Sequence, residues 1–333
     1  MYRRLRISLK VWVVAVVAVA GSLAAAGYAS ASRAHRQSRK TPTTTINVGV
    51  LPIADVAPVY LGIKEGFFAK QHLKLVPHAL QGGAAVVSAV VGGSLQFGFG
   101  ATANLIEATS KGLPVQFVAN GDEAGARAAT DWSGILVKAG SPITSVKQLA
   151  GKTVAANAVD GENELALDAI LQRNHVSPSA VHVVALPFPT MPTALAGGKV
   201  DAVTEVEPFV SAIEAQGGKN LSPLFEGMAP SLVVAGYFAT KHEISTDPAL
   251  VKRFVTAINE SLAYARTHAR AVRAIIPTYT KIPASVAKKM PLPVWNPTLN
   301  RGDIQYQEKL IVKLHWISKP VPLAKIIWSG AKS

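Results

Sequence analysis

The stretch from Gly82 to Asn104 reads GGAAVVSAVVGGSLQFGFGATAN, and it decides the fold of this chain. A Gly-Gly pair opens a short helix of small apolar residues. The second pair, Gly92-Gly93, ends that helix, because glycine adopts the left-handed conformation of a helix C-terminus without steric cost. Leu95–Phe99 then predicts a strand, which stops at Gly100-Ala101-Thr102, where another helix begins. This order is one unit of an α/β sheet, and the end of such a strand favours ligand binding.

A similar sequence pattern occurs later in the chain. Ala194–Val203 (ALAGGKVDAV) can be laid over Ala89–Gly98 (AVVGGSLQFG). Both are small-residue helices that end in Gly-Gly and are followed by a strand. A chance match is the alternative, but the repeat favours two similar lobes, each with a strand end aimed at a shared cleft.

The rest of the chain alternates strands and helices, which predicts mostly parallel sheets. The clearest helices are Glu162–Asn174 and Pro248–Ala269, and the latter carries Leu250, Phe254, Ile258 and Leu262 at helical spacing. Expected strands are Ile46–Pro52, Leu73–Leu80, Val115–Ala119, Gly134–Val137, Lys152–Ala156, Val181–Leu186 and Leu232–Ala239, and further helices are Pro58–Lys64, Thr102–Ser110 and Ser145–Ala150.

These elements suggest a division of the chain. We expect residues 46–133 to form the first part of lobe 1 and residues 134–235 to form lobe 2. Residues 236–333 then return to lobe 1 and end in C-terminal helices that wrap it. Gly134–Val137 and Leu232–Ala239 are the two strands expected to cross between the lobes.

The N-terminal residues 1–31 have the features of a signal peptide. A basic start precedes the apolar run Val11–Ala20, and Ala29-Ser30-Ala31 offers a small-x-small cleavage site. An uncleaved N-terminal anchor is the alternative, because no charge occurs from Val11 to Ser32, about the length that spans a bilayer. Residues 32–45 form a polar, basic linker. Either way, the body of the protein is expected to be extracytoplasmic, secreted or held in the periplasm or cell envelope.

Composition excludes several classes of function. The 333 residues are 49% hydrophobic, which indicates a globular protein. They include no cysteine, so there is no disulfide framework, thiolate nucleophile or Cys-based metal site. Removing residues 1–31 lowers the formal net charge from +14 to +10, since four basic residues and no acidic ones are lost. No stripe of Arg and Lys alternates with aromatic residues, so nucleic-acid binding is not expected.

The order of these sequence motifs along the chain resembles that in the solute-binding proteins of ABC importers. The resemblance is strongest to the branch that includes aliphatic sulfonate, taurine and nitrate binders and the pyrimidine-precursor (thiamine synthesis-like) domain. It covers residues 46–269 well and the remainder weakly. It is carried by Pro58–Phe68 (PVYLGIKEGFF), Gly82–Gly100, Lys111–Val115 (KGLPV), Leu149–Ala155 (LAGKTVA), Gly197–Ala202 (GGKVDA) and Glu207-Pro208-Phe209.

The resemblance implies a periplasmic-binding-protein fold of type II. Two α/β lobes, joined by two crossing strands, would close on a ligand like a hinge. The implied partners are a small-molecule solute and an ABC permease in the membrane, with no cofactor, and we expect a monomer. The chain departs from Gram-positive members of the family in lacking a lipid-anchor cysteine, so its retention near a permease is not explained.

In lobe 1, candidate ligand contacts lie where strands end. Backbone N–H groups at the starts of the helices after Gly82 and Ala101 could hold an anion such as a sulfonate, carboxylate or nitrate. Alternatively, the glycines only allow helices to pack closely on the sheet. The candidates are Asp55, Gly83, Ala84, Ala101 and Thr102.

In lobe 2, the candidates are mostly acidic. Asn157, Gly161 and Glu162 lie between a strand and its helix, and Glu205 and Glu207 lie at the next strand end. Helix capping is the alternative for such carboxylates, although Glu207, just before Pro208, favours ligand contact. The excess of acids disfavours a simple dianion. A zwitterion, an amine or a heterocycle with N–H donors is therefore an equal candidate.

Three aromatic residues could also contact a ligand. Phe188 and Tyr237 could stack on a flat solute, and Trp132 lies at an expected crossing between the lobes. Aromatic side chains of this kind also belong to hydrophobic cores, which is the alternative for all three.

The sequence argues against an enzyme. Its eight histidines show no pair at metal-ligand spacing on one helix, and neither a GxSxG motif nor a P-loop is present. A catalytic member of the pyrimidine-precursor branch is expected to sacrifice an active-site histidine and to carry a Cys-rich iron motif, which this cysteine-free chain lacks. A sensor domain without a transporter stays open as another class of function.

Overall fold

The structure is a computed structural model that describes residues 42–333. Residues 43–333 form one compact unit. The expected signal peptide or anchor (1–31) and most of the expected linker lie outside the described residues. The first strand starts at Thr44, two residues before the start of the expected strand Ile46–Pro52. Within residues 42–333, no helix combines the length and apolar character needed to cross a bilayer.

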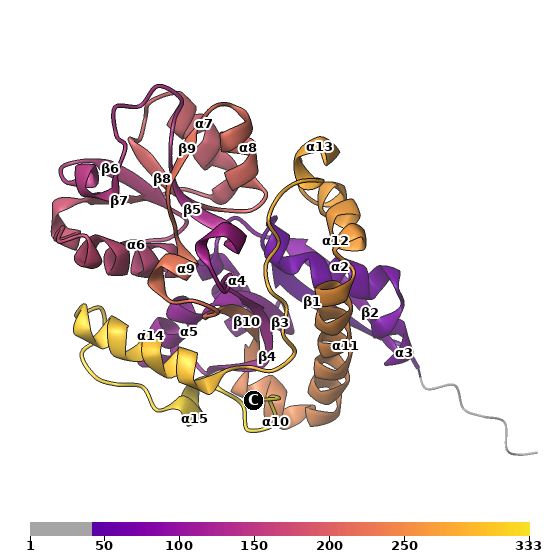
Figure 1. The fold of residues 1–333 in the computed structure, drawn as a ribbon. Coiled ribbons are helices and arrows are strands. Elements are labelled where there is room, and N and C mark those ends of the chain that lie inside the picture. Colours follow the sequence, from indigo (N-terminus) through magenta and orange to yellow (C-terminus); the bar gives the residue numbers. More distant parts are fainter. Residues whose placement is uncertain (1–41) are drawn as a thin grey trace, which may run out of the picture. The chain divides into compact units, whose positions relative to one another are not determined.

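Lobe 1 is built on the first of two five-stranded sheets (Figure 1). Its strand order is β2-β1-β3-β10-β4. Strand β10 runs antiparallel to both of its neighbours, and the other four strands share one direction. The strands are β1 (Thr44–Val50), β2 (Leu73–Ala79), β3 (Phe97–Ala101), β4 (Val115–Glu123) and β10 (Val233–Thr240).

Lobe 2 is built on the second sheet, which repeats this arrangement. Its order is β7-β6-β8-β5-β9, and β5 is the strand that runs antiparallel to both neighbours. The strands are β5 (Ser133–Val137), β6 (Thr153–Ala156), β7 (His182–Ala185), β8 (Ala202–Val206) and β9 (Lys219–Pro223). The predicted α/β fold with two lobes and mostly parallel strand directions is therefore confirmed.

The chain crosses between the lobes twice. It leaves lobe 1 after β4 and enters lobe 2 at β5, and it returns between β9 and β10. Each crossing contains a short helix, η2 (Ala128–Thr130) or α9 (Phe225–Met228), rather than continuous strand. The predicted linking strands β5 and β10 exist, but each lies within the sheet that it enters.

The predicted internal repeat is confirmed. Helix α4 (Gly83–Val91) precedes β3, and helix α7 (Met191–Ala196) precedes β8. Both strands take the third place in their sheets. After each helix, one glycine adopts the left-handed conformation, with φ of 78° at Gly93 and 65° at Gly198.

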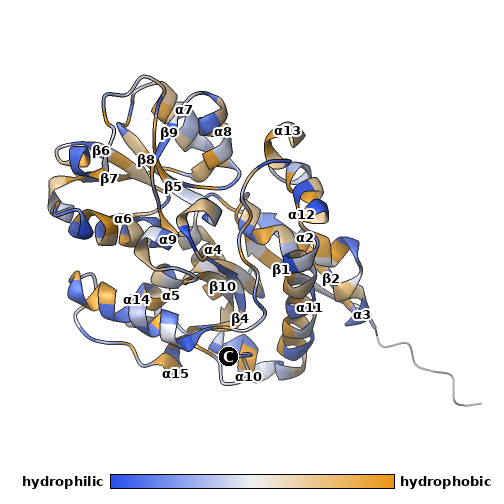
Figure 2. Ribbon diagram, in the orientation of Figure 1, coloured by the Kyte–Doolittle hydropathy of each residue, from blue (hydrophilic) through white to orange (hydrophobic). Residues whose placement is uncertain are grey.

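The long helix α11 (Pro248–Thr267) anchors lobe 1. Its four predicted core residues are all buried, and Phe254 stacks on Phe97 of β3 with ring centroids 3.9 Å apart. The helix packs against α2 (Ala57–Lys64), α3 (Phe67–Lys70) and β4. It ends two residues before its predicted end, because His268 leaves the helical conformation. Figure 2 shows hydrophobic and hydrophilic residues side by side on α11, as expected for a half-buried helix.

The remaining helices complete the two lobes. The predicted N-cap Ser145 forms a capping box with Gln148. The C-terminal segment returns to sheet 1, where Ile327 pairs with Phe117. These helices are η1 (Ala54–Val56), α5 (Thr102–Ser110), η3 (Val146–Leu149), α6 (Glu162–Arg173), η4 (Pro178–Ala180), η5 (Phe188–Thr190), α8 (Phe209–Ala215), α10 (Lys241–Thr246), α12 (Ala269–Ile275), η6 (Ile276–Thr278), α13 (Ala284–Ala287), α14 (Arg301–Lys313) and α15 (Leu323–Ile326).

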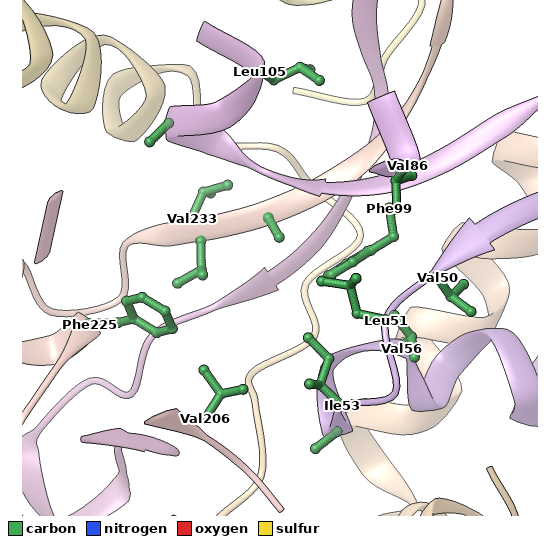
Figure 3. Packing of buried hydrophobic residues seen from close by; sticks show 14 of the residues in the cluster. Val50, Leu51, Ile53, Val56, Val86, Phe99, Leu105, Val206, Phe225 and Val233 are labelled. Atoms are coloured by element: carbon green, nitrogen blue, oxygen red, sulfur yellow. The ribbon is translucent and has the colours of Figure 1, made fainter. Parts of the chain in front are cut away.

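One hydrophobic core runs through both lobes. Val50 and Phe99 of sheet 1 belong to the same buried cluster as Val206 of β8 and Phe225 of α9, and Figure 3 shows these four side chains in one view. The two lobes are therefore packed against each other, and we refer to this arrangement as closed.

We expect Gly98→Ala to lower the free energy of unfolding by about 1–3 kcal/mol, because overpacking a filled core forces side chains and backbone to shift. A Cβ atom at Gly98 would lie 2.6 Å from Cγ1 of Val86 and 2.7 Å from Cζ of Phe238. The matched control is Gly82→Ala, since a Cβ atom there meets nothing within 4 Å. Urea unfolding measures both, and equal midpoints for Gly98→Ala and the wild type would contradict this packing.

Candidate functional site

The carboxyl ends of the parallel strands bring polar residues to the junction of the two lobes. Hydrogen bonds cross this junction, among them two that backbone N–H groups of lobe 1 donate to lobe 2. The backbone N–H of Ala103, at the start of α5 in lobe 1, donates to Oε2 of Glu162 in lobe 2 at 2.7 Å. The backbone N–H of Ala54 in lobe 1 donates to the carbonyl oxygen of Glu207 in lobe 2 at 2.9 Å. Both bonds depend on the closed arrangement.

Beside these bonds lies a group of buried polar side chains that we call the acidic cluster: Asp55, Asp122, Glu162 and Tyr237. All four are at most 3% exposed. Oδ1 of Asp55, both carboxylate oxygens of Asp122, Oε1 of Glu162 and the Tyr237 hydroxyl have no partner outside the cluster among residues 42–333, and the Asp55 and Asp122 carboxyls lie close enough to share a proton in a hydrogen bond with each other. Buried polar groups are normally paired, and each unpaired group costs about 1–3 kcal/mol. The acidic cluster is therefore an unusual concentration of free hydrogen-bonding capacity.

Proton affinities in the acidic cluster are strongly perturbed. Burial raises the pKa of Asp55 to about 7. Burial, and then the neighbouring Asp55 carboxyl, raise the pKa of Asp122 well above its usual range. Burial raises the pKa of Glu162 to about 8, against the opposing effect of its bond from Ala103. Burial, followed by Asp122 and Asp55, raises the pKa of Tyr237. These mutual effects place the four groups close together.

No positive side chain balances this cluster. Among residues 42–333, no Lys, Arg or His belongs to the buried residues, and none is among the groups that shift the pKa of the four cluster members. Buried carboxylates are ordinarily paired with cations or fully hydrogen-bonded. The interior of the site is therefore acidic while the basic residues lie on the surface.

A pair of tyrosines adjoins the acidic cluster. The rings of Tyr60 and Tyr279 stack with centroids 4.0 Å apart, and the Tyr279 hydroxyl donates to the carbonyl oxygen of Ile53 at 3.1 Å. The nearby groups that raise the pKa of Tyr279, after burial itself, are Tyr60, Asp55 and Tyr237. The stacked pair therefore forms an aromatic wall next to Asp55.

A groove of about 590 Å³ opens between the lobes beside this wall. Gln81 of lobe 1 and Gln216 of lobe 2 lie on its lining, together with Tyr279. Because Tyr279 belongs to both the groove and the aromatic wall, the groove adjoins the acidic cluster. Its other lining residues are Pro52, Ala79, Pro189, Pro192, Phe209, Ala212, Thr280, Lys281 and Ile282.

Asp122, Tyr60 and Tyr279 are not among the residues that the sequence predicts for the site. Asp122 did carry a signal, because the polar run 120–123 directly follows the apolar strand residues 115–119. The structure extends β4 through this run to Glu123. Tyr279 lies far along the chain, in a Pro-rich segment without any such pattern.

The predicted backbone contacts lie at three helix starts. Gly83 and Gly161 are buried at the starts of α4 and α6, and a Cβ atom at either would come within 4 Å of the Asn104 side chain. Ala101 is half-buried before α5, whereas Ala84 is exposed. Asn104 therefore lies beside the N-termini of a helix from each lobe.

Two further candidates differ in how their polar atoms are used. The Thr102 hydroxyl donates to the carbonyl oxygen of Val233 at 3.3 Å, so its proton is already used in a hydrogen bond within lobe 1. Asn157 is half-buried, and its Oδ1 has no partner among the described residues. Asn157 therefore keeps a free acceptor, while Thr102 does not.

Glu205 and Glu207 also differ. Both carboxylate oxygens of Glu207 accept hydrogen bonds from Ser211, from its hydroxyl at 2.6 Å and its N–H at 3.2 Å. Capping of α8 therefore accounts for the Glu207 side chain, and its predicted contact with ligand stays a prediction from the sequence. Glu205 is buried and has one oxygen, Oε1, without a partner among the described residues.

The three predicted aromatics have distinct surroundings. Trp132 is fully buried, packs against Phe225 and donates its indole N–H to the carbonyl oxygen of Glu123 at 2.9 Å. Phe188 is also buried. The ring of Tyr237 meets Phe99 edge-on in the core. Only Tyr237 offers a free polar atom, so Trp132 and Phe188 follow the core alternative.

Metal binding finds no support in the described part of the chain. Residues 42–333 contain no group of three or more His, Cys, Asp or Glu side chains arranged to hold a metal ion.

Several solved structures share this fold. The alkanesulfonate-binding protein SsuA from Xanthomonas axonopodis pv. citri, bound to MOPS, is 17% identical, with a TM-score of 0.72 over 86% of this chain and 99% of that one. The periplasmic nitrate-binding protein NrtA from Synechocystis PCC 6803 is 14% identical, with a TM-score of 0.70 over 83% and 82%. The desulfurization enzyme DSZB is 15% identical, with a TM-score of 0.62 over 85% and 96%.

Comparison by sequence gives a family. No curated protein matches the chain significantly. The family model described as NMT1/THI5 like matches residues 53–271, which include all of sheet 2, every strand of sheet 1 except β1, and all four residues of the acidic cluster. This chain therefore belongs to the NMT1/THI5-like family.

Proposed function

We propose that this protein is the extracytoplasmic solute-binding component of an ABC importer. It captures a small polar organic solute between its lobes and delivers that solute to a membrane permease. The observation that carries this proposal is the acidic cluster, whose buried atoms lack partners at the junction of two lobes. Family membership supports it, as do structural neighbours that bind an alkanesulfonate or nitrate.

The closed arrangement suggests how binding and closure are coupled. Closing the lobes forms the bonds from Ala103 to Glu162 and from Ala54 to Glu207, but it also buries the unpaired oxygens of Asp55 and Asp122. A solute that pairs these oxygens removes the cost of burying them. Ligand therefore shifts the hinge toward the closed state by its differential affinity for that state.

The protein acts outside the cytoplasm in this proposal, as a monomer. The N-terminal residues 1–31 serve as signal peptide or anchor. A solute-free protein would present the permease with open lobes and a loaded one with closed lobes. The solute classes consistent with the family resemblance are sulfonate-, taurine- or nitrate-like compounds and pyrimidine-like compounds.

Catalysis is not part of the proposal. The fold alone does not separate binding from chemistry, since a desulfurization enzyme shares it. The chain has no cysteine to act as nucleophile, and its acidic cluster lacks a basic partner. Binding without turnover is the function that these residues support best.

We expect at least one solute among sulfonates, taurine, nitrate and pyrimidines to raise the melting temperature in a thermal-shift screen. A ligand that binds only the folded state adds about 2.7 kcal/mol at 100-fold excess over its Kd. Product analysis of each mixture by mass spectrometry should show no conversion. Turnover of any stabilising solute would contradict the proposed function, and Glu65→Gln, at an exposed acid, is the control that should respond as the wild type does.

A further inference from the structure

We infer that the site between the lobes selects a small organic cation with N–H donors and rejects anions such as sulfonates and nitrate. This inference rests on the proposed function and names the substrate class of that same site. It follows from three features of the acidic cluster: what its atoms can accept, what charge surrounds them, and what already occupies the nearest helix N-terminus.

The first feature is hydrogen-bonding capacity. The unpaired carboxylate oxygens of Asp55, Asp122 and Glu162 only accept hydrogen bonds when ionised. The fully buried Tyr237 hydroxyl, on β10 and separate from the acids in the chain, is also unpartnered and can either donate or accept. A ligand that binds the ionised carboxylates must therefore supply most of the donors, and ammonium, amidinium and amino-heterocycle groups are the small groups that present several donors together and favour that ionised form.

The second feature is charge. No Lys, Arg or His among residues 42–333 is buried, so the acidic cluster has no internal counter-ion. Two unit charges about 4 Å apart interact by roughly 4 kcal/mol at the effective dielectric constant typical of protein sites. A bound cation therefore stabilises the ionised forms of Asp55 and Asp122, which burial alone disfavours, whereas an anion is repelled by them and gains nothing from their protonation. The ring faces of the Tyr60 and Tyr279 pair would attract a cation as well.

The third feature is the N-terminus of α5. Free N–H groups at such a position ordinarily form an anion site. Here the Ala103 N–H already binds a carboxylate, that of Glu162 from the opposite lobe. An anionic ligand at this position would have to displace Glu162 and break a bond that joins the lobes. When the lobes are closed, the Glu162 carboxylate therefore occupies the position at this helix N-terminus where an anionic ligand would otherwise bind.

A charge-matched panel tests the inference by thermal shift and calorimetry. Each set contains compounds that share one ring and differ in the charge of its substituent. One example is benzamidine as the cation, benzamide as the neutral compound, and benzoate and benzenesulfonate as the anions. We expect the tightest binder to be a cation, preferred over its matched anion by roughly tenfold or more. A panel in which an anion binds most tightly, or in which no cation exceeds its neutral match, overturns the inference.

A second arm uses solutes from a cell extract. The full-length protein is incubated with the extract, separated by gel filtration and denatured, and the released solute is identified by mass spectrometry. A released cation supports the inference. A released anion overturns it but leaves the proposed binding function standing, whereas no solute from either the extract or the panel rejects both.

The variant Asp122→Asn distinguishes a cation held by the acidic cluster from one bound elsewhere. It keeps the side-chain shape and removes one charge, so affinity for the best cation should fall by roughly 10- to 150-fold. Asp55→Asn should act in the same direction, and the exposed-acid control Glu65→Gln should have no effect. Far-UV circular dichroism checks folding of each variant. Unchanged cation affinity in both folded Asp variants would overturn the inference.

Discussion

Ligand-free protein is expected to be open at about pH 8.5 and closed at about pH 5. In the closed state, burial raises the pKa of Asp55 to about 7 and that of Glu162 to about 8. In the open state, water reaches both carboxyls, so their pKa values return toward the ordinary range near 4. The closed state therefore binds protons more tightly, and its advantage is complete below about pH 4 and is lost progressively as the pH rises from there through 7 and 8.

The size of this effect is large enough to move the equilibrium. At about 1.4 kcal/mol for each tenfold change in proton affinity, the rise at each of the two carboxyls is worth about 4 kcal/mol. About 5.5 kcal/mol is needed to shift a two-state equilibrium from 1:99 to 99:1. Asp122, whose pKa is also raised by burial and by Asp55, acts in the same direction. These groups therefore act together to move the equilibrium toward the open state as the pH rises.

Spin labels across the groove can measure this opening. Gln81 and Gln216 are exposed and line opposite sides of the groove, and the chain contains no cysteine, so Gln81→Cys with Gln216→Cys gives two specific attachment points. The distance between labels should lengthen between about pH 5 and pH 8.5. Adding Asp122→Asn and Glu162→Gln should hold the distance short at both values. One distance at both pH values in the wild-type background would contradict the mechanism.

Glu162→Ala is expected to lower solute affinity by roughly 10- to 150-fold, since a charge-assisted hydrogen bond is worth about 1.5–3 kcal/mol. The lost bond is the one from Ala103 that joins the lobes in the closed state. Each lobe should still fold, because the bond contributes only after closure. Isothermal titration calorimetry with the best solute at about pH 8.5, where Glu162 is ionised in either state, gives the affinity.

Glu164→Ala is the matched control for this variant. Glu164 lies in the same first turn of α6 and also accepts a bond from a backbone N–H, that of Asp160 at 2.6 Å. That bond stays within lobe 2. Equal losses of affinity in Glu162→Ala and Glu164→Ala would show that the helix start matters rather than the contact between lobes.

Much of the fold follows from local patterns in the sequence. Helix α5 was predictable at both ends, and the repeat of Ala89–Gly98 at Ala194–Val203 marked equivalent strands in the two sheets. Such elements depend on residues near one another in the chain, where glycine positions and helical spacing act directly. The long α11 was predictable for the same reason.

The far end of β4 was not predictable locally. The expected strand stops at Ala119, but pairing continues to Glu123 because distant residues support it. Asn120 donates to the carbonyl oxygen of Asn296 at 2.8 Å, and the N–H of Glu123 donates to that of Val294. These partners are more than 170 residues away in the chain. Asp122 enters the site only through this extension.

The site residues show the same difference between what nearby residues determine and what distant residues determine. Asp55 and Glu162 follow strands, so the rule that strand ends carry ligand contacts found them. Tyr279 reaches the site from the C-terminal segment, which no local pattern links to Asp55. For Glu207, the capping partner Ser211 lies only four residues away, so the sequence contained the evidence for capping as well as for ligand contact.

The late return of the chain to sheet 1, where β10 lies between β3 and β4, has a consequence for how the protein folds during synthesis. A chain that emerges N-terminus first can pair β1 with β2 and β3 early, but β4 has no neighbour until β10, which ends at Thr240, has also emerged. During that interval two strand edges stay open, and open edges recruit strands from other chains. Self-association should therefore be greatest for chains truncated just before Val233 and should fall once residues 233–240 are included, with lobe 2 complete in both.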